Sequence, residues 1–131
     1  MYIKYSVTIT TYAQRYYIKR FKKQYKSAWF VTEKAIIAQY ARLDSFLETS
    51  KAELILESGN IRIVKSEFSV AGTGISPKKS GNRCIVAIHT DKKIVKILLV
   101  YCKGGVSSSQ SETVWWRKKI IDNYPEYKSL F

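Results

Sequence analysis

Apolar and polar residues alternate at the start of the chain. Between residues 3 and 10 the odd positions are apolar or aromatic and the even positions are Lys, Ser or Thr. Strict alternation is typical of a β-strand with one buried face, because successive side chains point to opposite sides. The sequence therefore predicts an N-terminal strand over 3–10.

The spacing of apolar residues then becomes helical. One stripe predicts a helix over about 13–27, and a second predicts a helix over about 32–48 with Thr32 as its N-cap. Because few residues separate them, we expect an αα-hairpin. The stripes consist of Tyr17, Phe21, Tyr25 and Ala28, and of Ile36, Tyr40, Leu43 and Leu47, the latter widened by Ile37 and Phe46.

The remainder of the chain returns mostly to strand-like patterns. Residues 71–81 are rich in Gly and Lys and read as a mobile loop. The run 94–101 is apolar on both faces except at Lys96, which is typical of a central strand. The predicted strands are 53–57, 61–70, 82–89 and 94–101, with turns at 58–60 and 90–93.

A last helix is expected after the Gly/Ser-rich loop 104–111. Ser109 and Glu112 have the spacing of a capping box, and Pro125 should end the helix. The element order β-α-α-β-β-β-β-α predicts a single α+β domain over 1–131. In it, the N-terminal strand and helical hairpin pack on a mainly antiparallel sheet of four or five strands, with a C-terminal helix.

The net charge of the chain indicates what kind of partner it binds. The 131 residues include 23 Lys and Arg against 10 Asp and Glu, a formal net charge of +13. Residues 1–32 contain no acidic residue. An imbalance of this size favours a polyanionic partner, above all RNA. A merely soluble basic protein and one that meets an anionic membrane are the alternatives.

Several classes of site and location are disfavoured. No run approaches the roughly 20 apolar residues of a membrane helix, and the start has no signal-peptide pattern, so we expect a cytoplasmic protein without a membrane partner. Cys84 and Cys102 lie in apolar runs and are expected to be small, buried and reduced. His89 has no ligand partner at metal spacing, and paired carboxylates are missing. We therefore expect neither a metal nor a small-molecule cofactor.

Cations gather where strands end. Since the start of one antiparallel strand lies near the end of its partner, Arg83 and Lys103 should meet at one end of the sheet, with Tyr101 on the same face as Lys103. A guanidinium, an ammonium and a phenol suit RNA cleavage by the 2′-hydroxyl, which requires stabilisation of phosphorane charge. The alternative is a set of solvated cations that protect the sheet edge. The gathered cations are Lys65, Lys78, Lys79, Arg83 and Lys103.

The segment 59–103 resembles the RelE/ParE toxin superfamily. The motif pieces are a Gly-containing basic loop leading to an Arg strand start, at 78–83, and an apolar strand ending in Tyr-Cys-Lys, at 98–103. The resemblance implies a RelE-like fold and the toxin of a toxin–antitoxin pair, an endoribonuclease that cleaves mRNA on the ribosome. It implies a phosphate-binding role for Arg83 and auxiliary cations at Lys65 and Lys103.

The same resemblance suggests further roles. Some members keep a catalytic or base-stacking tyrosine where Trp115 or Trp116 falls here. Many of the family's ribonucleases carry Arg or His just after the last strand, whereas this chain has Lys103-Gly104-Gly105, so Tyr101 is the better candidate for a general base. The residues expected to contact RNA are Lys78, Lys79, Lys22, Lys23, Trp115 and Trp116.

Two other functions remain open. The chain could be a non-catalytic relative that inhibits gyrase, or a basic RNA-binding module, because the fold does not settle the activity. Alternatively, the basic helix at 13–27 could serve chiefly to bind an acidic antitoxin through Lys22 and Lys23. The expected partners are thus mRNA, the ribosome and a cognate antitoxin protein.

Overall fold

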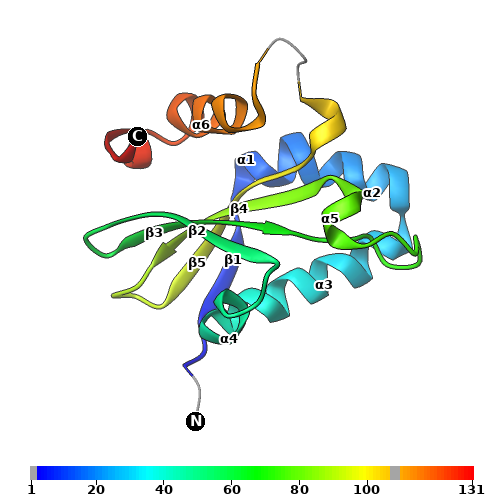
Figure 1. Ribbon diagram of the computed structural model, residues 1–131, viewed down its shortest axis with the longest axis horizontal. Helices are drawn as coiled ribbons and strands as arrows, with labels where there is room; N and C mark the ends of the chain where they lie inside the picture. Colours follow the sequence, from blue (N-terminus) through cyan, green and yellow to red (C-terminus); the bar gives the residue numbers. More distant parts are fainter. Residues whose placement is uncertain (1–2, 107–109) are drawn as a thin grey trace.

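The computed structural model describes residues 3–106 and 110–131 and contains one five-stranded sheet, in the order β1-β5-β4-β3-β2 (Figure 1). β1 pairs with β5 in parallel, and all the other pairs are antiparallel. The predicted α+β class and mainly antiparallel sheet are confirmed. The strands are β1 (Ser6–Ile9), β2 (Ala52–Ser58), β3 (Ile61–Glu67), β4 (Asn82–His89) and β5 (Ile94–Cys102).

Both faces of the sheet are covered. One face packs against the helical hairpin through a core that includes Trp29 and Tyr40, both fully buried. The other face packs against the C-terminal helix through Trp116 and Ile120. β4 and β5 lie in the middle of the sheet and are buried along most of their length, which is why the run 94–101 is apolar on both faces.

The helical hairpin is present, but its second arm begins earlier than predicted. The first arm is a continuous run of α1 (Thr11–Ala13), a π-helical turn η1 (Gln14–Ile18) and α2 (Lys19–Tyr25). The second arm is α3 (Ser27–Ala41), followed by α4 (Leu43–Leu47). The chain reverses at Lys26, whose φ is +52°.

The predicted N-cap at Thr32 is therefore wrong. Thr32 lies inside α3 and is buried, with its Oγ1 donating to the Ala28 carbonyl at 2.8 Å and accepting from the Ala71 backbone N–H at 2.9 Å. The hydroxyl ties the loop after β3 to the hairpin instead of starting a helix.

The segment predicted as the loop 71–81 contains a helical turn, α5 (Pro77–Ser80). Ser76 caps it, and Gly81 follows with φ +77°, a left-handed conformation that glycine adopts without strain. The Ser80 hydroxyl donates to the Phe68 carbonyl at 2.7 Å. This contact holds the turn against the end of β3, beside the start of β4.

The C-terminal region consists of η2 (Lys103–Gly105), α6 (Glu112–Asn123) and η3 (Pro125–Leu130). α6 lies on the side of the sheet opposite α3 (Figure 1). Its end before Pro125 is confirmed. Its N-cap is Ser111, whose Oγ accepts from the Val114 N–H at 3.1 Å, so the predicted capping box from Ser109 does not begin this helix. Ser109 itself lies outside the described residues.

The two cysteines differ in their surroundings. Cys84 is fully buried as predicted, and burial raises the pKa of its thiol to about 12. Cys102 is exposed, contrary to the prediction, because it is the last residue of β5, where the apolar run ends. Within the described segments, no helix is both long and apolar enough to span a membrane.

Candidate active site

Three of the predicted site residues lie on the face of the sheet that α6 covers. Arg83 on β4 pairs directly with Tyr101 on β5, and Lys65 on β3 pairs with Ile85. Because alternate residues share a face, Lys65, Arg83 and Tyr101 point to the same side. The predicted placement of Arg83, Tyr101 and Lys103 at one end of the sheet is present in the structure, where the Lys103 N–H donates to the Gly81 carbonyl two residues before Arg83.

The first residue of α6, Glu112, joins them. Its Oε2 accepts a hydrogen bond from the Tyr101 hydroxyl at 2.6 Å and lies 2.7 Å from the Lys65 ammonium. Its Oε1 lies 3.9 Å from the ammonium of Lys103. We call Lys65, Tyr101, Lys103 and Glu112 the Glu112 cluster. In it, one carboxylate is held between two ammonium groups at the end of the sheet.

The sequence identified Glu112 only as a capping residue. A usable signal was its position three residues before Trp115, because residues three apart on a helix lie on the same side. Trp115 was already expected at the site, so a carboxylate one turn away could have been included. The sequence alone could not show that α6 points this end toward Lys65.

The cluster fixes two protonation states. Burial raises the pKa of Glu112, but hydrogen bonds from Lys65 and Tyr101 and the charges of Lys65 and Lys103 outweigh it, so the net pKa lies below 4.5. Burial and the hydrogen bond to the Glu112 carboxylate raise the pKa of Tyr101 far above its usual value of 10.0. At neutral pH Glu112 is therefore a carboxylate and Tyr101 a protonated donor. This state favours a donor role for Tyr101 over the predicted role of general base.

Arg83 makes its contacts with α5, Asn82 and Glu67. Its side chain is only 7% exposed and lies 3.6 Å from a carboxylate oxygen of Glu67. The guanidinium donates to the Asn82 carbonyl at 2.9 Å and to the Pro77 and Lys78 carbonyls at 3.4 Å each. Arg83 thus anchors α5 to the start of β4.

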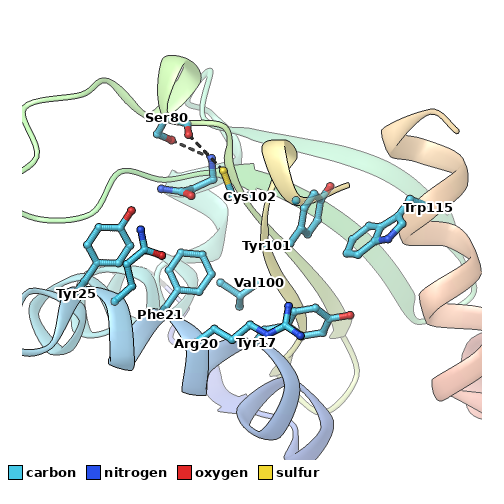
Figure 2. Close-up of a pocket in the computed structure, with 12 residues that line it drawn as sticks. Tyr17, Arg20, Phe21, Tyr25, Ser80, Val100, Tyr101, Cys102 and Trp115 are labelled. Carbon is cyan, nitrogen blue, oxygen red and sulfur yellow. Dashed lines mark hydrogen bonds between the residues drawn. The ribbon is translucent and has the colours of Figure 1, made fainter. Parts of the chain in front are cut away.

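A cavity of about 250 Å³ adjoins the Glu112 cluster (Figure 2). Tyr101 and Trp115 line it on one side, with ring centroids 4.8 Å apart, and Phe21 and Tyr25 line it on the other. Its lining residues are Tyr17, Arg20, Phe21, Gln24, Tyr25, Ser80, Asn82, Val100, Tyr101, Cys102, Gly105 and Trp115.

The two adjacent tryptophans of α6, Trp115 and Trp116, have different surroundings. Trp116 is 1% exposed and packs with Ile120 and the ring of Phe131 in the core under α6. Trp115 is half-buried and lines the cavity. Trp115 is therefore the tryptophan that lies at the site.

The remaining predicted RNA contacts are lysines of α5 and α2. Lys78 and Lys79 are exposed on α5. Lys22 and Lys23 are on α2, which belongs to the hairpin, and the Lys22 ammonium lies 5.8 Å from the centre of the Phe30 ring. The predicted cations thus lie on two parts of the fold, the end of the sheet with α5 and the first arm of the hairpin, and Arg20 of that arm lines the cavity beside the cluster.

His89 lies at the other end of β4. Its Nε2 is 2.7 Å from the Tyr127 hydroxyl, and burial followed by the charges of Lys96 and Lys92 lowers its pKa. Across residues 3–106 and 110–131, no group of three His, Cys, Asp or Glu residues lies close enough to hold a metal ion. His89 serves to dock the C-terminal segment.

Comparison with known proteins gave one structural similarity. No family model matches the sequence, and no curated protein is significantly similar to it. The fold is similar to a chain of the archaeal RelE-RelB complex from Pyrococcus horikoshii OT3, with a TM-score of 0.45 and 14% identity, over 79% of this chain and 99% of that one. At this identity no residue role is transferred from that protein.

Proposed function

We propose that this chain is a metal-independent endoribonuclease of the RelE type, the toxin of a toxin–antitoxin pair, and that it cleaves mRNA on the ribosome. The observation that carries the proposal is the Glu112 cluster, in which a carboxylate lies between two ammonium groups beside an aromatic cavity. The sequence motifs at 78–83 and 98–103 and the net charge of +13 support the same function.

The cluster contains the groups that RNA cleavage needs. The substrate supplies the nucleophile, its own 2′-hydroxyl, which attacks the adjacent phosphorus. Glu112 Oε1 takes the 2′ proton, because Oε2 is already occupied by Tyr101 and Lys65. The ammonium groups of Lys65 and Lys103 stabilise the charge on the phosphorane.

The leaving group is protonated by the exposed member of the cluster. Lys103, whose side chain is 52% exposed, gives a proton to the departing 5′-oxygen. The products are a 2′,3′-cyclic phosphate and a 5′-hydroxyl. Tyr101 acts as a positioning residue, since its hydrogen bond holds the carboxylate in place.

Arg83 retains a proposed role in phosphate binding. Two of its three carbonyl contacts are long, at 3.4 Å, and a phosphate offers a guanidinium a stronger, charged partner. Exchange of those contacts for a phosphate would also move α5, which carries Lys78 and Lys79. Arg83→Ala should then abolish cleavage while the chain remains folded.

The cleavage assay uses purified protein and 5′-labelled mRNA, with and without ribosomes and in excess EDTA. We expect cleavage to persist in EDTA and to leave a cyclic phosphate. Glu112→Gln should lower the rate about 10²- to 10⁴-fold, and Lys65→Met about 10²- to 10³-fold. Lys118→Met, an exposed change on α6, should leave the rate unchanged. Full activity of folded Glu112→Gln, or loss of cleavage in EDTA, would contradict the mechanism.

A second candidate is a non-catalytic protein of the same fold, either an RNA-binding module or a gyrase inhibitor. This candidate is favoured because two cations of the site already have partners within the protein. Lys65 forms an ion pair with Glu112, and Arg83 donates to backbone carbonyls. Salt-dependent RNA binding without a cleavage product would select the module. A DNA-damage response without mRNA cleavage would select gyrase inhibition.

A further inference from the structure

The cavity beside the Glu112 cluster is walled by flat aromatic surfaces. Phe21 and Tyr25 stand on one side of it and Trp115 on the other, with Val100 between them (Figure 2). Tyr17 lies edge-on to Trp115, with their ring centroids 6.5 Å apart. At about 250 Å³ the cavity lies just below the roughly 300–1,000 Å³ of sites for drug-sized ligands, so it suits a single small planar group.

One side of the cavity is an open strand edge. β1 pairs with β5 only from Ile94 to Ile97, so the sheet order leaves the rest of β5 without a strand neighbour on that side. The Lys103 N–H donates to the Gly81 carbonyl at 2.8 Å, toward β4. Because peptide groups alternate along an antiparallel pair, those of Val100 and Cys102 point away from β4, toward the open edge.

The open edge of β5 is hydrogen-bonded at its beginning and lines the cavity further along. The first outward carbonyl, that of Leu98, accepts a hydrogen bond from the Tyr124 hydroxyl at 2.7 Å. The next outward residues, Val100 and Cys102, line the cavity. Val100 presents an N–H beside a C=O, a donor next to an acceptor, and Cys102 presents its N–H, because its C=O begins η2.

Polar side chains complete the rim. Arg20 and Gln24 are exposed residues of α2 that reach the cavity, and Asn82 lines it from β4. A guanidinium can contact a phosphate or stack on a ring, and amides both donate and accept. The aromatic walls, the paired backbone donors and acceptors and the cationic rim together match the chemistry of a nucleotide.

We propose that this cavity binds one unpaired nucleobase of the RNA, stacked between Phe21 and Trp115 and read by the backbone of Val100 and Cys102. The inference rests on the proposed function, because the cavity shares Tyr101 with the Glu112 cluster and would hold a nucleotide next to the scissile phosphate. Every base carries neighbouring hydrogen-bond donors or acceptors on its edge. The cavity therefore discriminates between unpaired and paired bases more strongly than it discriminates among the four bases.

Binding is tested separately from cleavage. The full chain, labelled with ¹⁵N, is titrated with AMP, GMP, CMP and UMP, and ribose 5-phosphate serves as the ligand that has the phosphate but no base. We expect the amides of Val100 and Cys102 to shift with the nucleotides and not with ribose 5-phosphate. Equal shifts with ribose 5-phosphate would show a phosphate site and overturn the proposal.

Two variants and a matched control locate the site. Trp115→Ala should weaken nucleotide binding about 5- to 150-fold, the fold-change that corresponds to the loss of one stacking partner. Arg20→Ala should weaken it as well, whereas Arg15→Ala removes an exposed arginine of the same helical run that does not line the cavity, and should not. Unchanged affinity in Trp115→Ala, or equal losses in the two arginine variants, would overturn the proposal.

The outcomes separate this inference from the proposed function. Nucleotide binding at Val100 and Cys102 with no RNA cleavage would refute the ribonuclease and leave the base site standing. RNA cleavage at a normal rate in Trp115→Ala and Arg20→Ala, with no amide shifts in the wild-type chain, would refute the base site and leave the ribonuclease standing.

Discussion

Glu112 accepts a hydrogen bond from Tyr101 and forms an ion pair with Lys65, at 2.6 and 2.7 Å. These contacts place the folded-state pKa of Glu112 below the usual 4.5. A carboxyl group whose pKa is lowered on folding stabilises the protein above its unfolded-state pKa. That contribution is lost as the pH falls through the lower, folded-state pKa.

Glu112→Gln should therefore reduce the free energy of unfolding by about 1 kcal/mol at pH 7, a value discounted for partial exposure. The difference from the wild type should disappear in acid, once Glu112 is protonated in both states. Urea unfolding between pH 2 and pH 7 measures this. Asp122→Asn is the control, because its exposed pair with Lys118 should contribute about 0.3–0.5 kcal/mol. A difference that stayed constant down to pH 2 would contradict the ion pairs.

Thr32 offers a second test at the scale of one side chain. Thr32→Val keeps the shape but removes the hydroxyl, which leaves the Ala71 N–H without its acceptor and should cost about 1–3 kcal/mol in unfolding free energy. Thr32→Ser keeps the hydroxyl and should cost less. Urea unfolding compares the two variants, and a Val variant more stable than the Ser variant would show that the hydrogen bond to Ala71 contributes little.

Part of the site could be predicted at this scale. Antiparallel pairing of two recognisable strands was enough to bring Arg83 and Tyr101 together. The direction of the Arg83 guanidinium could not be predicted, because it depends on the carbonyls of α5, a helical turn in what looked like a flexible loop. Glu112 was missed because its contacts depend on how α6 docks.

At the scale of elements, the sequence predicts β4 to the residue and β5 to within one, because apolar strands bounded by turn residues have clear ends. The predicted start of the second helix near Thr32 is wrong, because it rests on a capping side chain that α3 does not use. The hairpin instead reverses at Lys26, a residue with φ +52° and no side-chain cap. Such a reversal has no sequence signature when the residue is lysine.

Lys26→Gly should therefore stabilise the protein. A non-glycine residue in a sparsely populated backbone region costs about 1–3 kcal/mol, and glycine relieves part of that cost, so we expect a gain of about 1 kcal/mol in unfolding free energy. Lys34→Gly, at an exposed position inside α3, should instead lose about 1 kcal/mol. Urea unfolding measures both, and a loss in Lys26→Gly would contradict the strained turn.

At the scale of the whole molecule, the positive charge is divided between two regions. One surrounds the Glu112 cluster and α5, at the end of the sheet. The other lies on the hairpin, whose main core is on the opposite face of the sheet from α6 and whose first arm also contacts the α6 side through Tyr12 and Tyr17. The sequence predicted this division, but it could not assign a ligand to each region.

The surroundings of Lys22 and Lys23 favour a protein as the ligand of the hairpin. The Lys22 ammonium lies over the ring of Phe30, which is 54% exposed, and the next residue of the chain, Val31, is 59% exposed. Apolar side chains bordered by lysines fit an acidic amphipathic segment better than they fit a phosphate backbone. The hairpin is thus the better place for the proposed antitoxin.

Charge reversal separates the two assignments. Lys22→Glu with Lys23→Glu should weaken the complex with the acidic antitoxin at least tenfold, because like charges would then face each other across the interface. The rate of RNA cleavage should change far less, since the Glu112 cluster is untouched. Titration calorimetry and the cleavage assay measure the two effects. Lys92→Glu with Lys128→Glu makes the same change in net charge, at the β4–β5 turn and on η3, and should weaken neither. If reversal on the hairpin instead lowers the salt dependence of RNA binding by about one unit of log–log slope per lysine and leaves the protein complex intact, the hairpin contacts RNA.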